Sequence, residues 1–142
     1  MKLLLALDGS KHSLVALDAL VARLDWFAEP PQIDLLTVHA AVPYPGAIAR
    51  VGKDVMQQYY DDESEAALKP AEARLAAKDI EYEKVKLVGD PAAEIVRHAV
   101  TRGCDLIVMG THGHTSIANL VMGSVATKVL ASTKIPVLLL RQ

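Results

Sequence analysis

The chain has 142 residues, of which 51% are hydrophobic and 23% are charged, and its formal net charge is -2. This length suits a single domain over residues 1–142, with enough apolar chain for a packed interior rather than disorder. The near-neutral charge argues against a nucleic-acid partner, which a basic chain would favour. A single cysteine, Cys104, excludes an internal disulfide and a cysteine zinc cluster, and it favours a reduced, cytoplasmic location.

The opening apolar run, Leu3 to Leu7, ends at Asp8 and is too short for the core of a usual signal peptide. We interpret it as a buried strand. No apolar segment of the sequence approaches the roughly 18 residues that span a bilayer, so we expect no membrane association.

Strand and helix patterns alternate along the chain. After the first strand, apolar residues at helical spacing predict a helix over residues 11–27, which ends before Pro30 and Pro31. A second strand, 33–39, leads into a loop over 41–52 and then a helix over 53–78, in which Pro70 should produce a kink or a break.

The third strand, 83–88, alternates valine and leucine with lysine, which predicts an edge strand with one wet face. Asp90 and Pro91 begin the next helix, and Gly103 ends it. A fourth strand over 105–109 is followed by a loop over 110–122, with a single helical turn over 117–121. A helix from Ser124 and a fifth strand, 136–140, complete the pattern.

This alternation predicts an α/β fold with an open parallel sheet and helices on both faces. Ligands of such sheets bind at the carboxyl ends of the strands. We therefore expect Asp8, His39 and the loop that begins at Gly110 to share one edge of the sheet.

The most informative motif is Gly110-Thr111-His112-Gly113, with nine residues between Gly113 and a following Gly123-Ser124. Glycines at the end of a strand let backbone N–H groups approach a ligand, and a helix that starts after them adds its free N–H groups and a partial positive charge. This combination predicts a phosphate site. Its spacing is neither that of a Walker A loop nor that of the Rossmann glycine motif.

With these motifs, the chain resembles the ATP-binding subgroup of the universal stress protein family. The resemblance runs through nearly the whole length and rests on four segments: residues 6–13 (ALDGSKHS), 89–91 (GDP), 105–125 with the glycine spacing, and 136–140 (PVLLL). It implies a five-stranded, Rossmann-like parallel sheet in the order 3-2-1-4-5, of the adenine nucleotide alpha hydrolase type.

The resemblance also implies a nucleotide site that binds ATP together with Mg²⁺. By position, Asp8 is near the adenosine and the metal of the triphosphate, Val38 meets adenine through its backbone, and Met109 lines the base pocket. The residues implied to bind the ribose and phosphates are Gly110, Gly113, Gly123, Ser124 and Val125. We add the neighbours of these residues to the predicted site: Ala6, Leu7, His112 and His114.

His114 stands where some ATP-binding relatives have a lysine, and a neutral imidazole supplies less charge to a phosphate. Three alternatives remain open at this point. The glycines can serve only as turn residues, Asp8 can cap the first helix, and His39, His112 and His114 can bind zinc, although no cysteine or placed carboxylate completes a tetrahedral set.

The fifth strand, Val137 to Leu140, is apolar on both faces, and a bare apolar edge invites pairing with another chain. The resemblance implies a homodimer formed by Val137, Leu138, Leu139 and Leu140. We expect an ATP-binding stress-response protein that acts as a nucleotide-dependent switch on an unidentified regulatory partner.

Two other functions remain open. One is a slow ATPase or self-phosphorylating enzyme, for which His112, His114 and Ser124 are the available nucleophiles, although none has an evident general base. The other is a dimeric scaffold that needs no nucleotide.

Overall fold

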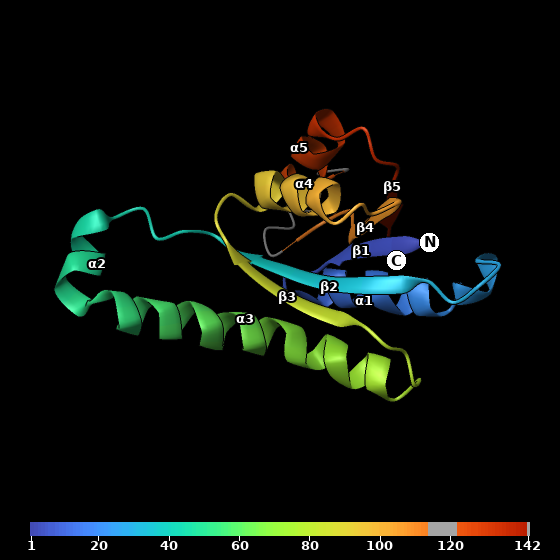
Figure 1. Ribbon diagram of the computed structural model, residues 1–142, viewed down its shortest axis with the longest axis horizontal. Coiled ribbons are helices and arrows are strands. Elements are labelled where there is room, and N and C mark those ends of the chain that lie inside the picture. The colour runs from blue at the N-terminus through green and yellow to red at the C-terminus, as the bar shows by residue number, and fades with distance from the viewer. Residues whose placement is uncertain (114–121, 142) are drawn as a thin grey trace.

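The computed structural model describes residues 1–113 and 122–141 (Figure 1). Its parallel sheet has the order β3-β2-β1-β4-β5, which confirms the predicted fold and strand order. The strands are β1 (Lys2–Ala6), β2 (Gln32–His39), β3 (Glu83–Val88), β4 (Leu106–Gly110) and β5 (Val137–Leu140).

The helices are α1 (Lys11–Val21), α2 (Pro45–Val51), α3 (Lys53–Ala76), α4 (Pro91–Thr101) and α5 (Ser124–Ser132), with a short 3₁₀ helix over Leu24–Trp26. Helices α1 and α3 cover one face of the sheet, while α4 and α5 cover the other (Figure 1). The central strand β1 is buried on both faces because Leu3 and Leu5 face one helix layer and Leu4 faces the other. A continuous apolar run is the pattern that such a strand requires.

Two predicted boundaries were wrong, and so was one of the two outcomes expected at Pro70. The first helix ends at Val21 instead of residue 27, and a separate 3₁₀ turn follows it. The predicted loop over 41–52 contains α2, which begins at Pro45 and ends before Gly52, where φ is +87°. Pro70 does not break α3, which is a single helix from Lys53 to Ala76. The predicted turn over 117–121 lies outside the described residues.

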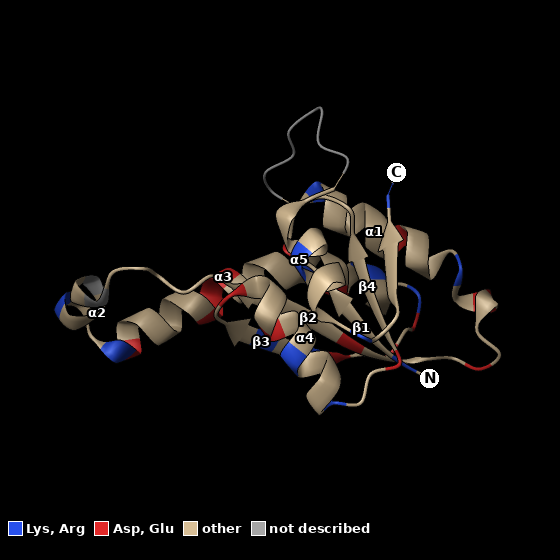
Figure 2. Cartoon of the chain, turned by 90° about the horizontal axis from the view of Figure 1, so that it is seen from above, with Lys and Arg blue, Asp and Glu red and all other residues tan. Residues whose placement is uncertain are grey.

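The edge position of β3 was predicted correctly. Its two lysines stay partly exposed, and both pair with acidic residues of α3; Figure 2 colours the lysines blue and the acidic residues red. Lys86 Nζ lies 2.5 Å from Asp61 Oδ1 and 2.7 Å from Glu65 Oε1, and Lys84 Nζ lies 2.9 Å from Glu65 Oε2. Hydrogen bonds to Asp61 and Glu65 raise the pKa of Lys86. The polar helix α3 therefore docks here through ion pairs, in addition to its apolar contacts.

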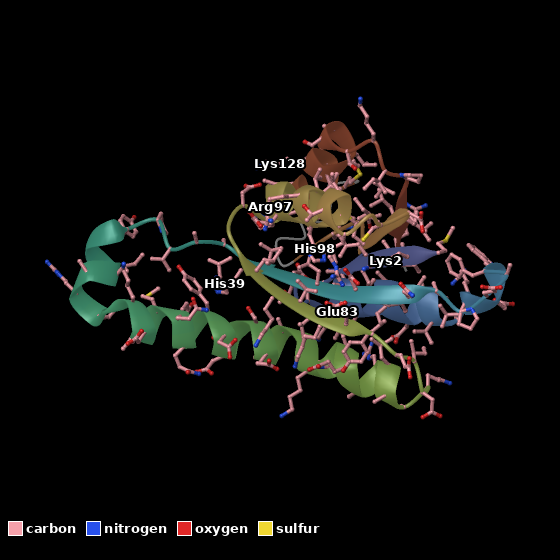
Figure 3. All side chains as sticks on the ribbon, in the orientation of Figure 1. Lys2, His39, Glu83, Arg97, His98 and Lys128 are labelled. Carbon is pink, nitrogen blue, oxygen red and sulfur yellow. The ribbon has the colours of Figure 1, made fainter. Side chains whose placement is uncertain are left out.

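At the amino ends of the strands, Asp34 of β2 is 2% exposed and is surrounded by basic groups. His98 Nε2 lies 2.9 Å from Asp34 Oδ2, Arg102 Nε donates to the same oxygen at 3.2 Å, and Lys2 Nζ lies 3.4 Å from Oδ1. Figure 3 shows His98 on α4, Lys2 on β1 and Glu83, a further partner of Arg102, on β3.

Burial of Asp34 disfavours its charged form, but the hydrogen bonds from His98 and Arg102 and the charge of Lys2 outweigh burial, so the pKa of this carboxyl lies below its usual value. This cluster ties α4 and three strands together at the amino end of the sheet. The charged side chains of the cluster form hydrogen bonds and ion pairs with one another.

Candidate functional site

The strand order brings the predicted site residues together at the carboxyl end of the sheet. Strands β1 and β4 are neighbours, and Ala6 is aligned with Met109 in their register. The segments that leave these two strands, 7–10 and 111–113, therefore run side by side. The chain passes from β1 to β2 on one side and reaches β4 on the other, and this reversal of strand order is where open α/β sheets bind ligands.

A pocket of about 460 Å³ lies at this position, which is within the size range of small-molecule sites. Every predicted site residue that the structure describes lines it: Ala6, Leu7, Asp8, Val38, Met109, Gly110, His112, Gly113, Gly123, Ser124 and Val125. His114 lies outside the described residues.

Seven further residues of the lining were not among those predicted: Ser13, Leu36, Ala40, Pro91, Ile95, Thr111 and Ala126. Most of them are sequence neighbours of predicted positions, or small and apolar residues without a recognisable signal. Ser13 and Pro91 could have been found, because each lies in the first turn of a helix that follows a strand ending at the pocket.

The inner part of the pocket is apolar. Leu36 and Val38 come from β2, Met109 from β4, and Ile95 from α4, and all four pack with the core layer beneath α4 and α5. Such a slot, with backbone groups at its edge, suits a planar, mostly apolar ring.

The outer part is built from backbone that a side chain would block. A Cβ atom on Gly113 would lie 2.5 Å from Asp8 Oδ2, closer than any real Cβ contact. A Cβ atom on Gly123 would lie 3.2 Å from the Thr111 carbonyl oxygen, and one on Gly110 would lie 3.3 Å from the His112 carbonyl oxygen. These glycines are therefore more than turn residues, because their lack of a side chain lets three backbone segments and a carboxylate come together.

Helix α5 begins at the backbone around Gly110, Gly113 and Gly123, which we call the glycine cradle. Gly123 is its N-cap residue, and among the described residues no side chain caps the first turn. The Gly123 N–H donates to the Thr111 carbonyl at 2.6 Å, which ties the start of the helix to the end of β4. The helix presents its N-terminal partial charge and N–H groups to the pocket at Ser124 and Val125.

Asp8 is the only carboxylate among the described residues of the lining. Its Oδ1 accepts a hydrogen bond from the Ser10 N–H at 3.0 Å, which fixes the carboxylate at the end of β1. Asp8 does not cap α1, because Ser10 is the N-cap residue and its Oγ accepts from the Ser13 N–H at 3.2 Å. The carboxylate is thus held toward the glycine cradle.

His39 does not join this pocket, although Val38 and Ala40 on either side of it do. Its ring packs against Tyr59 and Tyr60 of α3, with centroid distances of 5.5 and 5.2 Å (Figure 3). His39 ends β2 and so lies at the same edge of the sheet as Asp8, as predicted, but it does not line the pocket. Within residues 1–113 and 122–141, no three His, Cys, Asp or Glu side chains converge on a point that could hold a metal ion.

A search for membrane-spanning segments among the described residues finds no helix with the length and hydrophobicity to cross a bilayer.

The comparisons with known proteins agree with this architecture. The family model described as "Universal stress protein family" matches residues 1–141. A universal stress protein of Thermus aquaticus is 36% identical over 140 residues, which cover 98% of this chain and 97% of that protein.

Two solved structures have the same fold. Protein MJ0577 of Methanocaldococcus jannaschii superposes with a TM-score of 0.81 at 24% identity, covering 99% of this chain and 95% of that one. A universal stress protein in complex with cAMP superposes with a TM-score of 0.64 at 25% identity, covering 99% and 96%. From the matched family model and this relative, the chain belongs to the universal stress protein family.

Proposed function

We propose that this chain binds ATP, together with Mg²⁺, in the pocket at the carboxyl end of the sheet, and that it acts as a nucleotide-dependent regulatory switch in a stress response. The observation that carries the proposal is the pocket itself. Residues from four separate segments, which the sequence motifs single out for a nucleotide, line one space of about 460 Å³. The related protein whose structure contains cAMP supports an adenine nucleotide as the ligand class.

The two parts of the pocket match the two parts of such a ligand. Adenine would occupy the apolar slot formed by Val38, Leu36 and Met109, and backbone groups at the end of β2 would select its ring edge. The phosphates would lie at the cradle of Gly113 and Gly123, where the start of α5 offers N–H donors and a partial positive charge.

The donor set also fits a magnesium ion that enters with the nucleotide. Mg²⁺ is usually held by one or two carboxylates plus phosphate oxygens. Asp8 supplies one carboxylate, fixed by the Ser10 N–H and directed at the Gly113 backbone. When bound, the ion would neutralise part of the phosphate charge, and Asp8 would hold it.

The direct test is isothermal titration of nucleotide-stripped protein with Mg-ATP. We expect saturable binding with one ATP per chain. No binding at millimolar ATP would contradict the proposal. Incubation with γ-labelled ATP then separates a switch from an enzyme: we expect no released phosphate and no labelled protein, and either product would favour the slow ATPase or self-phosphorylating enzyme.

The regulatory role has its own test in cells under stress. We expect a variant that combines Gly113→Ala with Gly123→Val to fold but not to bind nucleotide, and to lose the survival that the wild-type chain supports. Unchanged survival would favour a scaffold that needs no nucleotide.

We also propose that two copies of the chain pair along β5, and that the dimer presents its surface to a regulatory protein. All four residues of β5 are half-buried within one chain, and β5 is the last strand of the sheet. The Pro136 carbonyl accepts a hydrogen bond from Ile107 of β4, and the Leu140 carbonyl accepts one from Thr111, which follows β4. By the alternation of a parallel strand, Leu139 therefore directs its backbone groups to the open edge.

Light scattering after size exclusion tests this pairing. The wild-type chain should elute as a dimer, and Leu139→Pro, which removes an N–H from the open edge, should elute as a monomer with an unchanged circular dichroism spectrum. A wild-type monomer at high micromolar concentration would contradict the pairing.

A further inference from the structure

The phosphate end of the pocket lacks basic side chains. Among the described residues of the lining there is no lysine or arginine, and Asp8 adds a negative charge. An ATP molecule brings several negative charges to this position. Helix α5 and a magnesium ion would offset part of them, and a donor at the outermost phosphate would add to this stabilisation.

Two histidine rings lie near one another, one in the pocket lining and one beside it. His112 lines the pocket, and its ring centroid lies 5.9 Å from that of His12, which belongs to the first turn of α1. The Thr111 hydroxyl lies 2.9 Å from His112 Nδ1 and orients that ring. His12 is exposed, and the next residue, Ser13, lines the pocket.

The spacing of the rings suits a shared acceptor. An imidazole N–H donates to an oxygen at about 2.8 Å. Rings whose centres are 5.9 Å apart and whose planes are inclined by 47° are close enough for one phosphate oxygen to accept from a nitrogen of each. The backbone brings them together, because a Cβ on Gly110 would lie 3.4 Å from the His12 carbonyl oxygen, so α1 packs directly against the end of β4.

We propose that His12, together with His112, binds the outermost phosphate of the nucleotide and thereby makes the pocket prefer ATP to AMP and adenosine. This inference rests on the proposed function and adds a residue that lies outside the glycine motif. His12 contacts the ligand only when the phosphate chain is long enough to pass the glycine cradle and reach the first turn of α1.

The test compares His12→Ala with Lys11→Ala, a matched control that removes a charge from the same exposed turn. Titrations use ATP, AMP and adenosine as probes. We expect His12→Ala to weaken ATP binding at least about tenfold, the loss of one hydrogen bond to a charged group. AMP should change less than about twofold, adenosine should be unaffected, and Lys11→Ala should change all three by less than about twofold, within the range of an exposed charge.

A double-mutant cycle sharpens the test. If both rings hold one oxygen, the combined variant of His12→Ala and His112→Ala should lose less ATP affinity than the product of the two single losses. Both single variants should keep the melting temperature of the wild type, since His12 is exposed and His112 is only partly buried.

Three results would overturn the inference alone: unchanged ATP binding in His12→Ala, an equal loss for adenosine and ATP, or an equal loss of ATP affinity in Lys11→Ala. A wild-type chain that binds none of the three probes would instead overturn the proposed function, and this inference with it.

Discussion

At the amino end of the sheet, the buried Asp34 is contacted by His98, Arg102 and Lys2, whereas at the carboxyl end three glycines keep side chains out of a pocket of about 460 Å³. In the first region the polar groups pair with one another. In the second, backbone donors and one carboxylate converge on a space. The contrast teaches that polar groups stabilise the fold at one end of the sheet, while at the other, in our proposal, they contact a ligand.

The largest effect is expected at the amino end. Asp34→Ala leaves three basic groups without their shared buried partner, which should lower the free energy of unfolding by about 3 kcal/mol. Urea denaturation measures this loss. Nucleotide affinity of the folded fraction should not change, because Asp34 is at the opposite end of the sheet from the pocket; a large loss of affinity would break the division between the two ends.

The glycine variants should show the reverse pattern. Gly113→Ala places a Cβ atom against Asp8, so ATP affinity should fall at least about tenfold, or about 1.4 kcal/mol. The urea midpoint should remain close to that of the wild type. Gly46→Ala is a matched control, because a Cβ there meets no atom within 4 Å, and it should change neither property.

The pH dependence of stability should separate the two ends further. The folded-state pKa of Asp34 is below its usual 3.8, so its contribution is fully present above that value and is lost as the pH falls through the folded pKa. The stability difference between the wild type and Asp34→Asn, measured by urea denaturation at several pH values, should therefore shrink below pH 3.8. A difference that grows in acid would contradict the assigned pairing.

The smallest effect on the free energy of unfolding is expected at the C-termini of α3 and α4, which have the same backbone geometry. Ile80 N–H donates to Leu75 O, and Cys104 N–H donates to Ala99 O, each after a residue with positive φ: Asp79 at +52° and Gly103 at +63°. Asp79→Gly should raise the free energy of unfolding by about 0.5 kcal/mol, because glycine adopts this conformation without strain.

Gly103→Ala is the opposite change at the equivalent position, and it should lower the free energy of unfolding by about 1 kcal/mol. Thermal unfolding of both variants measures the pair. If both substitutions raised the free energy of unfolding, or both lowered it, the positive φ would not be what determines the stability of these helix ends.

Most of the fold could be predicted because its strands are apolar or alternating segments with clear ends. The strand from Leu3 and the motif from Gly110 to Ser124 are local patterns, and both lead to the same end of the sheet. The sheet order came from the family resemblance, since no local pattern distinguishes which strands are neighbours.

The features that the sequence did not reveal depend on residues far apart in the chain. Asp34 is 64 residues from His98, and Lys86 is 25 residues from Asp61, so neither pairing leaves a local signal. Helix α2 was missed because Pro45 and Gly46 are typical of loops, although Pro45 occupies a position in the first turn where helices accept proline. The packing of His39 was missed because its tyrosine partners come from α3.

The most direct test of the central claim is the mass of any small molecule that co-purifies with the chain, measured by native mass spectrometry. Wild-type protein should carry an adenine nucleotide, at one per chain, and the combined variant of Gly113→Ala with Gly123→Val should be folded and carry none. Equal nucleotide content in both proteins, or a different ligand class in the wild type, would contradict the account.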